Sequence, residues 1–210
     1  MIIKQASPQM IRYACQNFHY SKSIPSVQYG YSIYNDANEW CGVVCFGSGA
    51  TPNIGKRYGL CQGEILELVR VALNGKQKCT SQCVASAMRR LHQENPLVRM
   101  LVSYADIDKK HCGIIYQATN WIYEGVTNQN DRCAFLINGV RMHPRTVYSK
   151  GWKQSVKWLQ ENVDPNADII KGKGKHKYIY CFDRKLAKKM SKNKNPYPKR
   201  FIMQFDESTL

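Results

Sequence analysis

The sequence has few acidic side chains for its length. Among 210 residues there are 15 Asp and Glu against 31 Lys and Arg, a formal net charge of +16. An excess of this size predicts attraction to polyanions, nucleic acid first and anionic membrane second. No run of about 18 apolar residues is present, which excludes a spanning helix, and the first residues lack the pattern of a secretory signal peptide. We therefore expect a soluble intracellular protein that does not associate with membranes.

Motifs for two common kinds of site are also missing. Zinc sites favour Cys-x2-Cys pairs with a second pair or histidines at a matching distance. Here Cys41/Cys45 and Cys79/Cys83 are each four residues apart, and the others of the nine cysteines stand alone. We expect no metal site of this kind and no disulfide framework, with most cysteines acting as small buried hydrophobic residues. No G-x-x-x-x-G-K-[ST] segment occurs, so a P-loop nucleotidase is not supported.

The sequence does contain enough apolar material for a core. Hydrophobic residues make up 43% and aromatic residues 11%, which excludes wholesale disorder. The length suits one domain, or one domain with an appendage. The charge is uneven, because residues 1–140 carry a net charge of +5 and residues 141–210 a net charge of +11. The C-terminal third is therefore the part expected to face a polyanion.

Hydrophobic periodicity and turn residues predict an α/β fold with a mixed sheet and helices packed on it. A long helix joins strands 64–73 and 97–105, which requires a parallel, right-handed crossover. A hairpin precedes this unit, and an antiparallel strand pair follows it. In strand 64–73 we expect Leu66, Leu68 and Arg70 on one face and Glu67 and Val69 on the other. The expected strands are 2–3, 28–34, 40–46, 64–73, 97–105, 121–126, 133–140 and 177–182, and the expected helices are 8–18, one from near Thr80, 109–119, 152–163 and a final basic helix.

The loop after strand 64–73 is the first candidate site. Gly75, Lys76 and Lys78 precede a helix N-terminus, where free backbone N–H groups and a partial positive charge bind phosphate. A pyrophosphate is expected here. The alternative is an ordinary turn with solvated lysines.

Two further clusters carry groups suited to catalysis. Ser103 and Asp106 lie at the C-terminal end of a parallel strand, where such sheets bind ligands, and Tyr116 follows in the next helix. A carboxylate there can accept a proton and a phenol can donate one; the alternative is that Asp106 caps helix 109–119 and Tyr116 packs in the core. The loop from His19 to Ser23 is rich in titratable or nucleophilic groups, although a surface loop with a chance histidine is the commoner case.

The motifs occur in an order that is similar to the Mom family of phage DNA-modification proteins. The set is H-Y-S-K-S-x-P, V-C-F-G, E-L-x-R-V, S-Y-A-D and G-I-I-Y-Q-A-T-N-W-I-Y-E-G. The resemblance covers roughly residues 15–180 and is most specific from Ser103 to Gly125; the alternative is a related acyltransferase-fold protein with another substrate. It implies the fold of GCN5-related acetyltransferases, a mixed sheet with helices on both faces. Residues 1–140 would form the catalytic core, and the basic part at 141–210 would complete the fold and contact DNA.

The resemblance also implies an activity. Adenine in double-stranded DNA would receive a carbamoylmethyl-type group on its exocyclic amine, which protects phage DNA from host restriction. The protein would be encoded by a phage or prophage and would act in the host cytoplasm. Its partner would be double-stranded DNA, and the resemblance does not decide between a monomer and a homodimer. The other hypotheses are a non-catalytic basic DNA-binding protein on the same scaffold and an acetyltransferase for another amine.

The resemblance assigns roles to particular residues. The donor would be acetyl-CoA or a related acyl donor, although the loop at 74–80 departs from the R/Q-x-x-G-x-G/A pattern of acetyltransferases. Iron is connected with the family, with His19 as the first ligand to suspect, but no histidine spacing establishes a metal site. The expected catalytic residues are His19, Tyr20, Arg70, Ser103, Asp106 and Tyr116; the donor-binding residues are Val71, Leu73, Gly75, Lys76, Lys78, Thr80 and Ser81; the DNA-binding residues are Lys22, Arg141, Arg145, Lys173, Lys175, Lys177, Lys185, Lys188 and Lys189.

Overall fold

The computed structural model describes residues 1–49, 51, 53–127, 129 and 131–199 and divides them between two compact units. The first unit contains residues 1–104, 113–125 and 177–199, and the second contains residues 105–112 and 126–176. This division differs from the expected boundary at residue 140. The chain leaves the first unit after residues 104 and 125, and it returns at Gly113 and Lys177. The last strand and helix therefore belong to the first unit.

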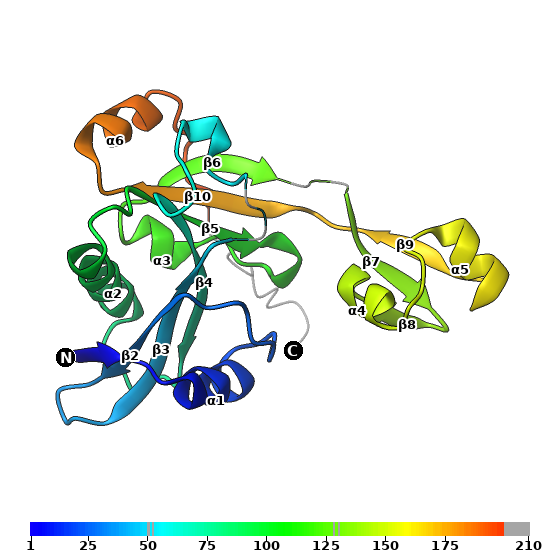
Figure 1. The fold of residues 1–210 in the computed structure, drawn as a ribbon, viewed down its shortest axis with the longest axis horizontal. Coiled ribbons are helices and arrows are strands. Elements are labelled where there is room, and N and C mark those ends of the chain that lie inside the picture. The colour runs from blue at the N-terminus through cyan, green and yellow to red at the C-terminus, as the bar shows by residue number, and fades with distance from the viewer. Residues whose placement is uncertain (50, 52, 128, 130, 200–210) are drawn as a thin grey trace, which may run out of the picture. The chain divides into compact units, whose positions relative to one another are not determined.

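A seven-stranded sheet runs through the first unit (Figure 1). Its order is β1-β2-β3-β4-β5-β10-β6. Strands β1 to β4 are antiparallel neighbours, and β4 and β5 are parallel, so the expected mixed sheet is confirmed. The strands are β1 (Ile2–Gln5), β2 (Tyr29–Tyr34), β3 (Trp40–Gly47), β4 (Ile65–Leu73), β5 (Met100–Asp106), β6 (Ile122–Thr127) and β10 (Lys175–Cys181).

Helix α1 (Pro8–Phe18) covers one face of this sheet. It begins as the sequence predicts, because the Ser7 side chain accepts a hydrogen bond from the Met10 amide and proline occupies the first turn. Ala14 of the helix packs with Cys45 and Ala72 of the sheet, and all three are fully buried. Removing such apolar surface from water is the main force that holds a helix on a sheet.

Helix α2 (Thr80–Glu94) makes the β4–β5 crossover and lies on the opposite face. The Tyr31 hydroxyl donates to Glu94 Oε2 of α2 at 2.8 Å, and Tyr31 pairs with Val44 in the β2–β3 ladder. Val44 and Cys45 are consecutive in a strand, so they point to opposite faces. The expectation of helices on both faces is therefore confirmed.

A β-bulge in β4 changes which side chains share a face. Arg70 pairs with Cys45 and Leu68 pairs with Phe46, which leaves Val69 without a residue opposite it. The extra residue turns Arg70 to the α1 face while Leu68 stays on the α2 face. The expectation that Leu68 and Arg70 share one face is therefore wrong.

The expected helix 109–119 is also wrong. Two short turns replace it, η2 (Ile107–Lys109) and α3 (Ile114–Gln117). Lys110 has a φ of 57° and Gly113 a φ of 74°, and this left-handed backbone ends a helix. A Cβ on Gly113 would lie 2.5 Å from the Tyr178 ring and 2.9 Å from the Tyr116 ring, so only glycine fits between these rings.

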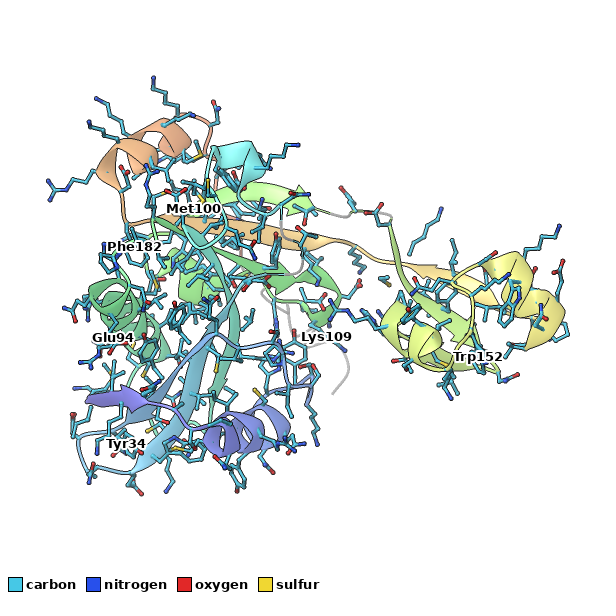
Figure 2. The ribbon with its side chains drawn as sticks, viewed as in Figure 1. Tyr34, Glu94, Met100, Lys109, Trp152 and Phe182 are labelled. Atoms are coloured by element: carbon cyan, nitrogen blue, oxygen red, sulfur yellow. The ribbon has the colours of Figure 1, made fainter. Side chains whose placement is uncertain are left out.

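The second unit has its own small sheet and core. The strands expected at 121–126 and 133–140 do not pair with each other: β6 belongs to the large sheet, and the second strand is central in a three-stranded sheet of order β8-β7-β9. Phe135, Val147 and Leu159 form the core, and the half-buried Trp152 packs against it (Figure 2). The elements are β7 (Arg132–Ile137), β8 (Val140–Met142), β9 (Asp168–Lys171), α4 (Pro144–Ser149) and α5 (Val156–Asn162).

The expected basic helix is α6 (Arg184–Ser191), which packs on the first unit together with η1 (Lys56–Tyr58). Asp183 caps α6 by accepting bonds from the Lys185 and Leu186 amides, and it also binds Arg99 at 2.6 Å. Leu186 is buried with Met100 and other apolar residues of the sheet. In the part of the chain that the structure describes, no helix is both long and apolar enough to cross a bilayer.

Candidate active site

The candidate site begins where β4 and β5 stop pairing. Three residue pairs join the strands, ending at Glu67 and Val102. Beyond them, the Leu68 carbonyl oxygen accepts a hydrogen bond from the Ser103 hydroxyl at 2.9 Å. The Ser103 side chain thus gives the Leu68 carbonyl oxygen the hydrogen bond that continued pairing of the two strands would otherwise supply. Ser103 therefore links the two strands just beyond their last residue pair.

Tyr116 contacts the strands at Ser103. Its hydroxyl is 2.8 Å from the Ser103 hydroxyl, and its ring packs against Trp121 and Tyr178 with centroids 5.1 Å away in both cases. Burial raises the pKa of Tyr116 to about 12. Because Ser103 has one proton and the Leu68 carbonyl can only accept, Tyr116 donates to Ser103 when Ser103 donates to Leu68. The phenol therefore carries its proton at neutral pH.

Two ionisable neighbours act on Tyr116. After burial, the largest cause of the shift, the charges of Tyr20 and Glu67 also raise its pKa, whereas the Ser103 hydroxyl lowers it. The structure therefore brings the Ser103 and Tyr116 hydroxyls into contact, whereas Tyr20 acts on Tyr116 only through its charge. Glu67 was not expected, and the E-L-x-R-V segment is the signal that could have found it.

Arg70 and the loop after α1 form a second cluster in the same unit. The Arg70 guanidinium donates to Ser23 Oγ at 2.8 Å and to the Ser23 carbonyl oxygen at 3.2 Å. Ser23 Oγ is 3.2 Å from Ser21 Oγ, which is 2.9 Å from His19 Nδ1. The His19 and Tyr20 rings lie against each other at a tilt of 33°, with centroids 4.3 Å apart. Arg70 and His19 are thus connected through two serines of the H-Y-S-K-S-x-P motif, to which the sequence assigned no role of their own.

Asp106 belongs to the second unit. Its side chain caps η2 by accepting a hydrogen bond from the Asp108 amide at 3.0 Å. This is the capping role that the sequence left as an alternative, on a shorter turn than expected. A catalytic role for Asp106 stays a prediction.

The loop expected to hold a pyrophosphate is bonded to itself and to its neighbours. The Gly75 amide donates to Gln77, the Lys76 amide donates to Asn74, and the Lys76 ammonium pairs with Glu39 at 2.8 Å. Val71 and Leu73 are half-buried in β4, and Lys78 is exposed. At the start of α2, the Gln77 amide group donates to Thr80, and the Ser81 hydroxyl lowers the pKa of the Cys79 thiol. Phosphate binding here would require some of these bonds to open.

A cavity of about 320 Å³ lies along helix α2. Ser81 and Arg89 of α2 line one side, and the rings of Tyr180 and Phe182 line another. Aromatic rings, an arginine and a helix N-terminus are the groups that bind a nucleotide-like molecule. The residues that line the cavity are Ser81, Gln82, Ala85, Met88, Arg89, Ala118, Thr119, Asn120, Tyr180 and Phe182.

Most of the residues expected to contact DNA are exposed. They lie in three places: Lys22 in the loop after α1, three lysines on α6, and four cationic residues in the second unit. In the second unit, Gly174 lies between Lys173 and Lys175. Its α-carbon packs so closely on the backbone that a Cβ there would lie 2.5 Å from the Thr127 carbonyl oxygen. The close packing of glycine leaves both lysines pointing to solvent. The exposed residues are Lys22, Arg141, Arg145, Lys173, Lys175, Lys185, Lys188 and Lys189.

Lys177 is the exception, and the structure corrects its assignment. Its side chain is 8% exposed, and its ammonium group pairs with Glu124 Oε2 at 3.1 Å. The ammonium group also donates to the Tyr58 hydroxyl at 2.7 Å, and the Tyr58 hydroxyl donates in turn to Glu124. Lys177 therefore belongs to a buried ionic cluster and cannot contact a phosphate.

The donor set does not fit an iron site. No group of three or more His, Cys, Asp or Glu side chains able to hold a metal occurs among the residues that the structure places. His19 Nδ1 also accepts a hydrogen bond from the Ser21 amide, which leaves the ring proton on Nε2, the nitrogen a metal would need. The iron expectation gains no support from these residues.

Comparison with known proteins identifies relatives over nearly the whole chain. Residues 1–199 match the model of the Mom protein family. The methylcarbamoylase mom of Escherichia phage Mu is 22% identical over 206 residues, which cover 94% of this chain and 83% of that protein.

Solved acetyltransferases are similar at a lower level. An acetyltransferase from Bacillus subtilis in complex with CoA has a TM-score of 0.49 at 10% identity, and the match covers 86% of this chain and 98% of that one. A variant of the spermidine N-acetyltransferase SpeG from Vibrio cholerae has a TM-score of 0.48 at 8% identity, covering 86% and 95%.

Proposed function

Because this chain belongs to the Mom protein family, we propose that it is a transferase that modifies DNA. The observation that carries the proposal is the family match over residues 1–199, together with the similarity to a methylcarbamoylase of phage Mu. The modified group is the exocyclic amine of adenine, which receives a carbamoylmethyl-type group. The biological result is protection of phage DNA from host restriction.

The chemistry requires access to the base and help for a weak nucleophile. The amine of adenine delocalises its lone pair into the ring, and a base inside the duplex cannot be reached. The target must therefore be flipped out at a cost of a few kcal/mol. Tyr20 is 54% exposed next to His19, which supports a role for its ring in stacking on the extruded base.

The protonated Tyr116 hydroxyl supports the transfer itself. A phenol with a pKa of about 12 keeps its proton in the resting enzyme and can donate a hydrogen bond to the departing group of the donor. Ser103 is placed to respond, because its hydroxyl can turn from Leu68 to Tyr116 as negative charge grows on the phenol oxygen. Glu67 is the nearby carboxylate suited to accept the proton released by the amine.

The donor is a relative of acyl-CoA that carries its leaving group on the methylene carbon, because attack of the amine on a thioester carbonyl would give an N-acyl adenine instead of a carbamoylmethyl adduct. The new bond joins the amine nitrogen to this methylene carbon, and the bond from that carbon to the leaving group breaks. The cavity along α2 is the part of the first unit suited to the nucleotide end of such a donor. Arg89 there offers a cation for a phosphate, and Tyr180 and Phe182 offer rings for a base. Because the amides of the loop at 74–79 are already hydrogen-bonded within the loop, the cavity is a better candidate than this loop for binding the nucleotide end of the donor.

Mass analysis of nucleosides from plasmid DNA tests the proposed function. Plasmid from cells expressing the chain should contain an adenosine adduct heavier by a carbamoylmethyl group, and plasmid from cells with an empty vector should not. Unmodified adenosine in DNA from cells with abundant folded protein would favour a non-catalytic DNA-binding protein. An acetylated small amine in those cells would favour an acetyltransferase for another substrate.

DNA binding is expected to depend strongly on salt through the lysines of α6. Each phosphate that a lysine neutralises contributes about −0.9 to the slope of log K against log salt. Replacing Lys185, Lys188, Lys189 and Lys192 by alanine should make the slope less steep by about 0.9 for each lost contact, while Leu186 keeps the helix packed. Fluorescence anisotropy with a labelled duplex at several salt concentrations measures the slope.

A matched variant shows where the contacts lie. Lys171, Lys173 and Lys175 are exposed in the second unit, and their replacement by alanine removes a similar charge elsewhere. A slope that is unchanged in the α6 variant and reduced in this one would move the DNA contact to the second unit.

A further inference from the structure

The serines that connect Arg70 to His19 form a hydrogen-bonded chain with a defined direction. A guanidinium group only donates, so Ser23 Oγ accepts from Arg70 Nη2. The hydroxyl proton of Ser23 is then available for Ser21 Oγ, 3.2 Å away. The proton of Ser21 is in turn available for His19 Nδ1, 2.9 Å away.

The backbone amide of Ser21 decides between this direction and the reverse one. It donates to His19 Nδ1 at 3.2 Å, so Nδ1 must present a lone pair. A proton on Nδ1 would face this N–H group and would leave two donors opposed. In the neutral ring one nitrogen is a donor and the other an acceptor, so the proton of His19 is on Nε2.

We propose that Ser21 and Ser23 are positioning residues that hold His19 in its Nε2–H tautomer, so that His19 serves the reaction as a hydrogen-bond donor. This inference rests on the proposed function for the reaction itself, but the tautomer follows from the hydrogen bonds alone. His19 then donates through Nε2 to an acceptor atom of the bound substrate instead of taking a proton from the amine. The proton acceptor must be another group.

The positive charge of Arg70 gives the chain a second effect. Hydrogen bonds in series polarise one another, and here each donor points from the guanidinium group towards the imidazole. Electron density is drawn from Nδ1, which makes the Nε2–H group a stronger donor. Arg70 therefore acts on His19 through Ser23 and Ser21, and its substitution by lysine would lose the geometry that reaches both the Ser23 hydroxyl and carbonyl oxygens.

The tautomer can be measured without any substrate. A long-range ¹H–¹⁵N spectrum of protein labelled with ¹⁵N-histidine distinguishes a protonated from an unprotonated ring nitrogen, and His19→Gln assigns its signals among the five histidines. At about pH 8, where an unperturbed imidazole is neutral, we expect Nε2 to be protonated and Nδ1 to be the acceptor. In Ser21→Ala the Nδ1 signal should move towards that of a free acceptor, because one of its two donors is gone.

The effect on activity separates positioning from simple packing. Ser23→Ala should lower the rate of DNA modification about tenfold, a loss of the size seen when a hydrogen-bond partner that orients a metal-bound histidine is removed. Ser23→Thr keeps the hydroxyl and should restore most of the rate. Ser26→Ala removes an exposed serine from the same loop and should change neither the rate nor the spectrum.

Two results would overturn the inference. One is a wild-type spectrum with the His19 proton on Nδ1, and the other is a Ser23→Ala variant that modifies DNA at the wild-type rate. Failure of the proposed function is distinguishable from both, because the wild-type chain would then leave DNA unmodified. In that case an Nε2–H spectrum still supports the chain of hydrogen bonds, and an Nδ1–H spectrum contradicts it.

Discussion

Replacing Tyr116 by phenylalanine is expected to lower DNA modification by about 10²-fold or more, the loss typical of a removed acid or base. The ring that fills the space between Trp121 and Tyr178 stays in place, so packing is preserved. The Ser103 hydroxyl keeps its bond to the Leu68 carbonyl oxygen, so no buried backbone group loses its partner. The stability loss should therefore be only about 1 kcal/mol.

The measurement is the fraction of modified adenosine in plasmid DNA as a function of expression time, with thermal unfolding of the purified variant alongside. Tyr178→Phe is the matched control, because it removes a hydroxyl from the same aromatic cluster. The Tyr178 hydroxyl accepts a hydrogen bond from Gln117. If Tyr116→Phe modifies DNA as fast as Tyr178→Phe does, Tyr116 is a core residue and nothing more.

Replacing Lys177 by methionine is expected to have the largest effect on stability, a loss of about 3–5 kcal/mol. The change leaves the Glu124 carboxylate, which is 13% exposed, without the ammonium group 3.1 Å away. Arg57 at 3.5 Å is a poor substitute, because its side chain is 64% exposed. The Tyr58 hydroxyl still donates to Glu124, but a neutral phenol cannot replace the positive charge of the ammonium group.

Chemical denaturation measures the loss, and two comparisons identify its cause. Lys175→Met changes an exposed lysine two residues earlier and should alter stability by no more than about 0.5 kcal/mol. The double variant Lys177→Met with Glu124→Gln removes both charges and should recover much of the loss. Equal stability of the two lysine variants would mean that the buried cluster contributes nothing.

Local signals in the sequence were enough to place most elements. Ser7 followed by Pro8 marks the start of α1, because a serine side chain caps free amides and proline needs no hydrogen bond there. The polar residues 35–38 mark the β2–β3 turn. Leu186 and Met190 stand four positions apart among the lysines of α6, which is the spacing of one helix face, and the Asp183 cap of this helix is local as well. Each of these depends on residues a few positions apart.

The candidate site was partly within reach of the sequence. The motif order placed Ser103 and Tyr116 in one cluster, and the structure brings their hydroxyls to 2.8 Å. It also singled out His19, Arg70 and the loop from His19 to Ser23, but not the hydrogen bonds by which its serines connect His19 to Arg70. Arg70 and Ser23 are 47 positions apart in the sequence. No local pattern predicts a hydrogen bond between residues so far from each other.

What the sequence alone determined about this protein is its charge, most of its secondary structure and its family, because these depend on composition, short-range periodicity and ordered motifs. The tertiary structure alone decided how the strands are placed relative to one another. Strand β10 enters the large sheet between β5 and β6, so Lys177 is buried although Lys173 and Lys175 before it are exposed at the same spacing. The bulge at Val69 likewise turns Arg70 towards the loop of His19. Both outcomes depend on which backbone lies alongside, and that is set by burial of surface between segments far apart in the chain.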